Sequence, residues 1–83
     1  MRNFTNMSTT VIAFGRLIDI VGKGQITIPH ATDTNQVLAQ LQQQFPALAS
    51  AAFIIAVDKQ IVHGNTALSG NNTVALLPPF AGG

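Results

Sequence analysis

The sequence predicts a small α+β domain in two layers, with one main helix packed on one face of a mixed sheet of about five strands. Three observations lead to this prediction. β-Branched and apolar stretches recur near both ends of the chain and in its second half, as strands do. A single amphipathic helical stretch lies between them. The chain has 83 residues, which is enough for one domain and no more.

The first strand is expected at residues 9–14, which are β-branched, aromatic and almost continuously apolar. Such a pattern is typical of a central strand that is buried on both faces. Gly15 ends this strand, and the spacing in Leu17–Val21 allows a short helical turn. Residues 25–28 alternate polar and apolar side chains, as a half-buried strand does. Pro29 ends that strand because proline cannot donate a ladder hydrogen bond.

The helix is expected at residues 31–45. Asp33 can cap its N-terminus, with Gln36 three residues later as the partner in a capping box. Thr34 is an alternative cap, and the sequence does not choose between the two. Pro46 stops the helix. One helical face is apolar and is formed by Val37, Leu38, Leu41 and Phe45.

The second half of the chain predicts three more strands. Residues 53–57 and 60–62 flank a two-residue turn and are expected to form a hairpin. A dense turn cluster at residues 69–72 precedes the last strand, Thr73–Leu77, which is again apolar on both faces. The strands at the two ends of the chain could pair with each other. Such pairing would make the C-terminus an extension of the most rigid part of the sheet.

The composition excludes several classes of function. Apolar residues make up 47% of the chain and charged residues 8%, against roughly 25% charged residues in an ordinary domain. High hydrophobicity excludes disorder of the whole chain. A net charge of +1 excludes binding of nucleic acid that is driven by electrostatic attraction. The absence of cysteine excludes disulfides, thiolate metal sites and a cysteine nucleophile. His30 and His63 are isolated, so we expect no metal site.

The expected organisation is a frayed leader at residues 1–8, a domain at residues 9–79 and a flexible tail at residues 80–83. The N-terminus lacks the apolar core of a signal peptide, and no stretch resembles a membrane span. We therefore expect a cytoplasmic protein.

The C-terminus reads Pro78-Pro79-Phe80-Ala81-Gly82-Gly83. Prolines fix φ and favour extended geometry, while glycines let a backbone enter a narrow channel and leave the α-carboxylate unobstructed. Six extended residues reach about 20 Å at roughly 3.3 Å per residue. We interpret this segment as an extended arm that carries the terminal carboxylate into a site on a partner protein.

A carboxylate is a poor electrophile, because its charge repels nucleophiles and hydroxide is a poor leaving group. An ATP-dependent partner can convert the Gly83 carboxylate to an acyl-adenylate. A sulfur donor can then displace AMP and leave a thiocarboxylate, which is a transferable form of sulfur. A chain without cysteine is consistent with this role, since it has no thiol of its own to be acylated.

The last ten residues, VALLPPFAGG, resemble the C-terminus of the MoaD family, the small subunits of molybdopterin synthase. That family typically ends Val-Ala-(Phe or Leu)-(Phe or Leu)-Pro-Pro-Val-(Ala, Ser or Thr)-Gly-Gly. Residues 55–62 resemble its third and fourth strands, and residues 14–22 resemble its Phe-Ala-x-Leu-Arg-Glu-x-x-Gly segment. The main departures from the pattern are in charge: the family's arginine falls at Ile18, and its acidic turn is replaced by residues 70–73.

The resemblance implies a β-grasp, ubiquitin-like fold. It also implies that a MoeB-like enzyme adenylates Gly83 with ATP and that a sulfurtransferase supplies sulfur. The thiocarboxylate would then donate sulfur to cyclic pyranopterin monophosphate inside a MoaE-like large subunit, within a heterotetramer. On this view the chain binds no cofactor of its own, binds no nucleic acid or membrane, and has no autonomous catalytic activity.

The residues expected to carry this role all lie near the C-terminus. Gly83 is the adenylate and thiocarboxylate acceptor; Gly82, Ala81 and Phe80 would insert into the large subunit. Pro78, Pro79 and Phe80 are expected to contact partners. For Phe80 two interpretations stay open: loose packing on the chain's own surface, or an anchor in a partner pocket.

Three apolar side chains next to the tail and the turn have a predicted position, and three other functions remain open. Phe14, Leu76 and Leu77 are predicted to lie in the core, with the alternative that one of them lies on the partner surface. The alternatives to a MoaD-type carrier are a ThiS-type carrier for thiamin thiazole, a ubiquitin-like modifier attached to lysines through Gly83, and a plain interaction module. Pro78-Pro79 favours MoaD over ThiS, because ThiS-type tails usually lack the two prolines.

Overall fold

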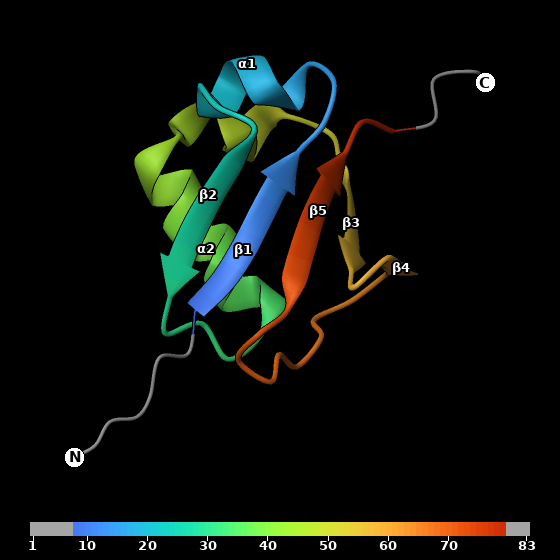
Figure 1. The fold of residues 1–83 in the computed structure, drawn as a ribbon. Coiled ribbons are helices and arrows are strands. Elements are labelled where there is room, and N and C mark those ends of the chain that lie inside the picture. The colour runs from blue at the N-terminus through green and yellow to red at the C-terminus, as the bar shows by residue number, and fades with distance from the viewer. Residues whose placement is uncertain (1–7, 80–83) are drawn as a thin grey trace.

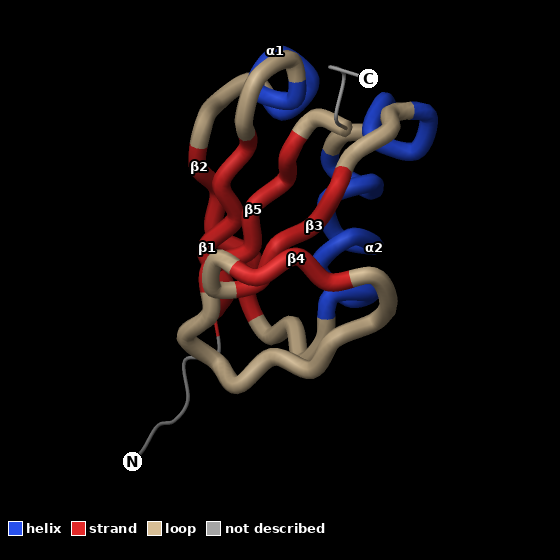
Figure 2. The backbone as a smooth tube through the Cα atoms, turned by 90° about the vertical axis from the view of Figure 1, so that its right-hand side faces the viewer, coloured by secondary structure: helices blue, strands red, loops and turns tan. Residues whose placement is uncertain are grey.

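The computed structural model describes residues 8–79 and has a single five-stranded sheet in the order β2-β1-β5-β3-β4 (Figure 1). The helices lie on one side of this sheet (Figure 2). This is the β-grasp arrangement that the sequence predicts. The elements in chain order are β1 (Ser8–Ala13), α1 (Leu17–Val21), β2 (Gln25–Pro29), α2 (Thr34–Gln44), the 3₁₀ turn η1 (Pro46–Ser50), β3 (Ile54–Val57), β4 (Gln60–Val62) and β5 (Thr73–Leu77).

The two strands from the ends of the chain pair with each other at the centre of the sheet, as the sequence allows, and the structure shows that this pairing is parallel. Their register runs from Thr10 opposite Thr73 to Ala13 opposite Leu76. All the other neighbours in the sheet are antiparallel. β1 begins at Ser8, one residue earlier than expected, because Ser8 pairs with Pro29 of β2. Because β1 and β5 point the same way, the chain leaves both strands at the same end of the sheet (Figure 1).

The hydrophobic core lies between the sheet and the helices. Alternate side chains of the central strands enter it, as the two-residue period of a strand requires. The largest apolar side chains that are almost wholly buried are Val11, Leu17, Ile28, Val37, Leu41, Leu48, Val74 and Leu76. Leu76 therefore occupies the core position that the sequence predicts.

The opposite face of the sheet is not covered by any element of residues 8–79. Ile12, Ala75 and Leu77 are only half-buried, and Phe14 is 45% exposed. The prediction that β1 and β5 are buried on both faces is therefore wrong, and so are the core assignments of Phe14 and Leu77. The physical reason is that the helices form one layer, which covers one face of the sheet. An apolar pattern on both faces of a strand indicates burial only where a second layer exists.

The capping of α2 is decided by its hydrogen bonds. The Asp33 carboxylate accepts a hydrogen bond from the backbone N–H of Gln36 at 2.9 Å. The Gln36 side chain in turn accepts one from the backbone N–H of Thr32 at 2.9 Å. Asp33 is thus the N-cap, and helix α2 is shorter than expected at its start. Thr34 instead ties the helix to the loop before β5, since its hydroxyl accepts from the N–H of Thr66 at 2.9 Å.

The hairpin between β3 and β4 turns through Asp58 and Lys59, both with positive φ (49° and 73°). Two successive left-handed residues match the twist of a two-residue hairpin. The Asp58 carboxylate accepts hydrogen bonds from the Thr73 N–H at 3.0 Å and from the Asn72 side chain at 2.6 Å. These two bonds lower the pKa of Asp58 and join the hairpin to the start of β5.

We expect the substitution Asp58→Asn to remove one source of acid sensitivity. A carboxylate whose pKa is lowered in the folded state contributes stability above its unfolded pKa of about 3.9, and that contribution is lost as the pH falls through the folded pKa. Asparagine tolerates the left-handed backbone, so the turn itself is kept. Urea unfolding between pH 2 and pH 7 should show a lower stability near neutrality and a shallower loss toward acid.

The matched control is Asp19→Asn, which removes the same charge at an exposed position on α1, far from this turn in the sequence. If the two variants had the same pH profile, the carboxylate bonds of Asp58 would not be a source of stability.

Candidate functional site

The candidate site begins where β5 ends, at the base of the C-terminal tail. Pro78 is half-buried and Pro79 is exposed, directly after the last residue of β5. Phe80, Ala81, Gly82 and Gly83 lie outside the described residues, as does the leader at residues 1–7. The structure therefore shows what holds the two prolines, and the roles expected for residues 80–83 stay predictions.

The tail base is held by the central strand pair. Leu76 is fully buried and pairs with Ala13 of β1. The backbone N–H of Phe14 donates a hydrogen bond to the Leu76 carbonyl at 3.0 Å, so the ladder continues one residue past the end of β1. The tail thus leaves from a strand that is bonded on both edges, because β5 also pairs with β3.

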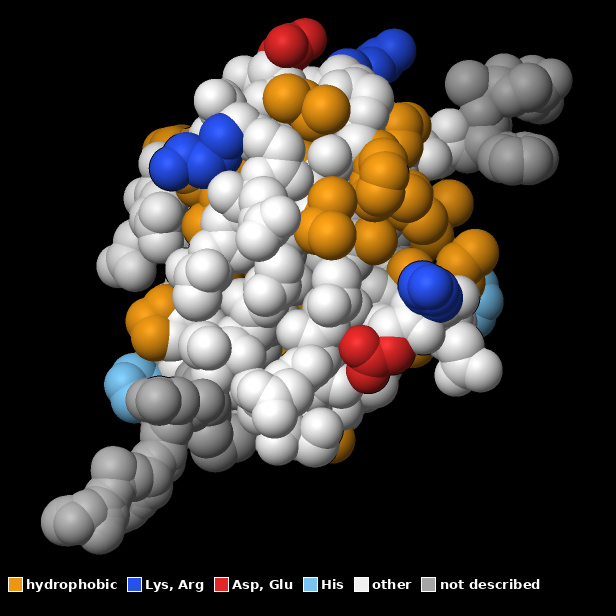
Figure 3. Space-filling view, viewed as in Figure 1, with side chains coloured by type: hydrophobic (Ala, Val, Ile, Leu, Met, Phe, Trp, Pro, Cys, Tyr) orange, Lys and Arg blue, Asp and Glu red, His pale blue; other side chains and the backbone are white. Residues whose placement is uncertain are grey.

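An apolar surface spreads over the uncovered face of the sheet beside this base (Figure 3). Residues directly opposite one another in neighbouring strands share a face. The register therefore places Ile12, Ala75, Ala56 and Ile61 in one row across four strands, and Leu77 and Ile54 in the next row. We call this surface the open face, and we include in it the exposed ring of Phe14, two residues beyond Ile12.

The open face carries charge only at its border. A hollow of about 470 Å³ lies on it and is lined by Ile12, Phe14, Thr73 and Ala75, with Asp58 and Lys59 at one end. Figure 3 shows the acidic and basic side chains at the edge of the apolar patch. The arrangement offers a partner a broad apolar contact with a polar border, which is the composition of a protein interface.

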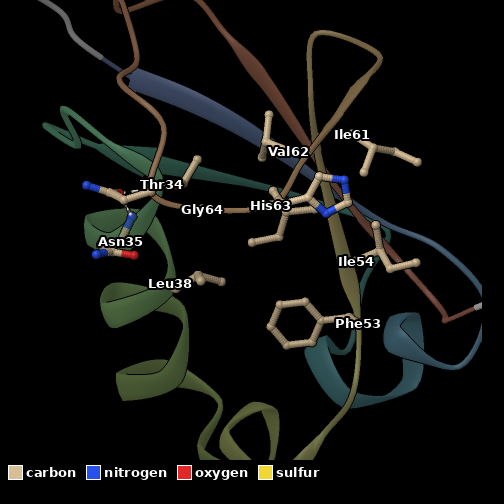
Figure 4. Close-up of a pocket in the computed structure, with 11 residues that line it drawn as sticks. Thr34, Asn35, Leu38, Phe53, Ile54, Ile61, Val62, His63 and Gly64 are labelled. Atoms are coloured by element: carbon tan, nitrogen blue, oxygen red, sulfur yellow. Dashed lines mark hydrogen bonds between the residues drawn. The ribbon is translucent and has the colours of Figure 1, made fainter.

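A second hollow, of about 530 Å³, lies between α2 and the β3–β4 hairpin. Figure 4 shows Leu38 and Phe53 on its two sides. Its polar end is formed by Thr34, Asn35 and Asn65. The Asn65 side chain accepts from the Asn35 N–H at 2.8 Å, so these polar groups bind the loop to the helix. These polar groups therefore have a structural role, while the apolar part of the hollow shares Ile54 and Ile61 with the open face.

Both histidines lie on the surface. Within residues 8–79 no three side chains of His, Cys, Asp or Glu come together as a metal site would need. No helix in the same part of the chain is long and apolar enough to cross a membrane.

Sequence reasoning located the tail but missed the open face. Ile12, Ile61 and Ala75 were not candidates, because their apolar side chains look like core residues in a sequence. A signal was present, however. The strands are apolar on both faces, and one main helix can cover only one of these faces.

Comparisons with solved structures agree with this fold. The chain is similar to the small archaeal modifier protein 1 from Methanosarcina acetivorans, with a TM-score of 0.81 and 18% identity, over 96% of this chain and 100% of that chain. It is also similar to a chain of the protein–protein complex of subunits 1 and 2 of the molybdopterin-converting factor from Helicobacter pylori, with a TM-score of 0.70 and 26% identity, over 93% and 100%.

A third similar structure is a candidate molybdopterin converting factor subunit 1 from Pyrococcus furiosus, with a TM-score of 0.79 and 17% identity, over 89% of this chain and 99% of that chain. The two likenesses under 25% identity show the β-grasp, ubiquitin-like fold alone. The model of the ThiS family matches residues 11–83, which is most of the sequence and includes the tail. The chain therefore belongs to the ThiS family.

Proposed function

We propose that this protein is the sulfur-carrier small subunit of a molybdopterin synthase, with the Gly83 carboxylate as the group that carries sulfur. The observation that carries the proposal is the position of the tail base. The parallel pair β1–β5 aims Pro78 and Pro79 out of the end of the sheet, next to an uncovered apolar face. Membership of the ThiS family and the likeness to a chain of a molybdopterin-converting factor complex support it.

The proposed chemistry starts with activation of the tail by a MoeB-like partner. A Gly83 carboxylate oxygen attacks the α-phosphorus of ATP, and pyrophosphate leaves. The terminal sulfur of a persulfide, supplied by a sulfurtransferase, attacks the acyl carbon of the adenylate and AMP leaves. A thiol then cleaves the resulting acyl disulfide, so that a thiocarboxylate remains on Gly83 and the donor departs as a disulfide.

Transfer follows inside the large subunit. The thiocarboxylate sulfur attacks an electrophilic carbon of cyclic pyranopterin monophosphate and displaces an oxygen substituent from that carbon, and water then hydrolyses the acyl–sulfur bond. Sulfur stays on the substrate and the carboxylate of Gly83 is regenerated. The chain contributes the sulfur, and the large subunit contributes the groups around the substrate.

Docking to a MoaE-like large subunit is proposed to use the open face together with the tail. The face begins beside the tail base, so one partner can bury both at once. Phe80 would add an aromatic anchor just beyond Pro79, since aromatic residues dominate the energetics of interfaces. Two such pairs would form the expected heterotetramer.

The Gly83 carboxylate is expected to be the working group. Incubation of the chain with ATP, a MoeB-like enzyme and a persulfide donor should give a mass gain equal to replacing one oxygen by one sulfur. Deleting Gly83, or adding one residue after it, should abolish this gain and leave thermal unfolding unchanged. Intact-mass spectrometry measures the first effect and circular dichroism the second.

The same experiment separates the alternatives. Lysine-linked conjugates would indicate a modifier, and transfer of the sulfur to a thiazole precursor, with none to cyclic pyranopterin monophosphate, would indicate a ThiS-type carrier. An active extended variant would show that the free carboxylate is not needed.

The open face is expected to bind the large subunit through Phe14. Because this ring is 45% exposed, Phe14→Ser should leave folding nearly unchanged. It should weaken binding by about 2 kcal/mol or more, which is roughly 30-fold in Kd. The matched control is Ile18→Ser on α1, which removes an apolar side chain of similar exposure (40%) outside the open face. Calorimetric titration should show a large effect for Phe14 alone, and equal effects would place the interface elsewhere.

Association with the large subunit is expected to change little with salt. The open face is apolar, and the two charged residues that line its hollow, Asp58 and Lys59, are of opposite sign. Screening by salt acts mainly on exposed charges, so it has little to weaken here. Titration of the two subunits at low and at physiological ionic strength should give similar Kd values, and a steep fall in affinity would contradict an apolar interface.

A further inference from the structure

The turn between β1 and α1 lies against the base of the tail. Gly15, at the start of this turn, has a φ of +60°, and the ring of Pro78 occupies the side on which a side chain of residue 15 would lie. A Cβ atom built on Gly15 would lie 2.7 Å from the Cγ atom of Pro78, which is closer than real Cβ atoms approach other heavy atoms. It would lie 3.7 Å and 3.9 Å from the Cδ and Cβ atoms of the same ring, which are ordinary contacts.

The glycine at the other end of α1 has no such neighbour. Gly22, at the other end of α1, also has positive φ (+87°), and a Cβ atom there would meet nothing within 4 Å. Backbone conformation alone can explain a glycine at position 22. At position 15 the close approach of the proline ring adds a second requirement.

The position of Pro78 fixes where the tail starts. The Phe14 N–H donates a hydrogen bond to the Leu76 carbonyl. The residue before Gly15 and the strand that leads to Pro78 are therefore held together by the β1–β5 ladder. Pro78 and Pro79 each have a fixed φ, and two successive prolines transmit direction because they favour an extended geometry. A displacement of the Pro78 ring therefore changes the direction in which the chain leaves Pro79.

We propose that Gly15 is a positioning residue for the tail. The absence of a side chain lets Pro78 lie against the β1–α1 turn, and this contact aims the residues after Pro79 at the partner's site. The placement of the tail does not depend on the proposed function, whereas its effect on sulfur loading rests on that function.

The test uses Gly15→Asn and, as the matched control, Gly22→Asn. Asparagine tolerates a left-handed backbone, so both variants keep the turn conformation at similar cost. Only the first adds an atom against Pro78. Both are made in the full chain and again in a Pro78→Ala background, where the Cγ atom is missing.

The first measurement needs no partner. The native chain has no cysteine, so Ala81→Cys gives a single attachment site for a nitroxide label. Paramagnetic broadening of backbone amides then maps the region that the tail visits. We expect Gly15→Asn to change this map and Gly22→Asn to leave it unchanged. In the Pro78→Ala background, Gly15→Asn should cause no further change.

The second measurement follows adenylation of the unlabelled chain by the MoeB-like enzyme. The open face is intact in Gly15→Asn, so KM should stay the same. A misaimed carboxylate should lower kcat by roughly tenfold, since small misplacements of a reacting group are costly. Gly22→Asn should retain the native kcat, and Pro78→Ala should remove the difference between glycine and asparagine at position 15.

The outcomes separate the two proposals. An unchanged broadening map, or a native kcat for Gly15→Asn, would overturn the role of Gly15. A native chain that is never adenylated would overturn the proposed function, while a changed map would still support the positioning contact. If Gly15→Asn fails to fold, a nuclear Overhauser effect between Gly15 and the Pro78 ring in the native chain supports the contact, and its absence overturns it.

Discussion

The parallel pairing of β1 with β5 is the constraint on which the rest of the structure depends. It brings the first and the last strand of the chain together at the centre of the sheet, where each has hydrogen-bonded neighbours on both edges. A parallel pair needs a long crossover connection, and here that connection holds the helix layer and the β3–β4 hairpin. The C-terminus therefore leaves from the most extensively bonded strand. Without this pair, Pro78 would have no fixed starting point.

The helix layer explains why one face of the sheet stays uncovered. α2 and η1 pack with α1 and the sheet around a core formed on one side only. The row from Ile12 to Ile61 lies on the other side, and its side chains are as apolar as those in the core. Large exposed apolar surfaces are typical of interaction sites. The fold thus places an uncovered apolar face next to the base of the tail.

The sequence predicted the elements well because their signals are local. The strand positions, the two-residue turn at Asp58-Lys59 and the stop at Pro46 each follow from residue type and spacing. The choice of Asp33 over Thr34 as the N-cap could not be predicted, because Thr34 is held by Thr66, which is distant in the sequence. The exposure of Phe14 was missed for a similar reason. Whether an apolar strand face is covered depends on the number of layers, which no single segment determines.

The contact between Gly15 and Pro78 was beyond the sequence as well. Gly15 reads as a strand terminator, and only the parallel register brings it to the tail. The side chains of Asp33 and Asp58 also have structural roles. Asp33 caps helix α2, and Asp58 joins the β3–β4 turn to the start of β5 by hydrogen bonds. These two carboxylates thus serve the fold.

The composition of the tail has a consequence for recognition. Gly82 and Gly83 have no side chains, so a partner can recognise only their narrow backbone and the terminal carboxylate. Any chain that ends in Gly-Gly would fit such a site equally well. On the proposed function, discrimination between carriers would therefore come from the residues before the two glycines: from Phe80, from the shape of the open face and from the direction in which the tail leaves it. A nearly uncharged face can supply this discrimination only by close packing, since it offers few charges for a partner to repel or attract. On this argument, the rigid pairing of β1 with β5 is as important for specificity as it is for stability.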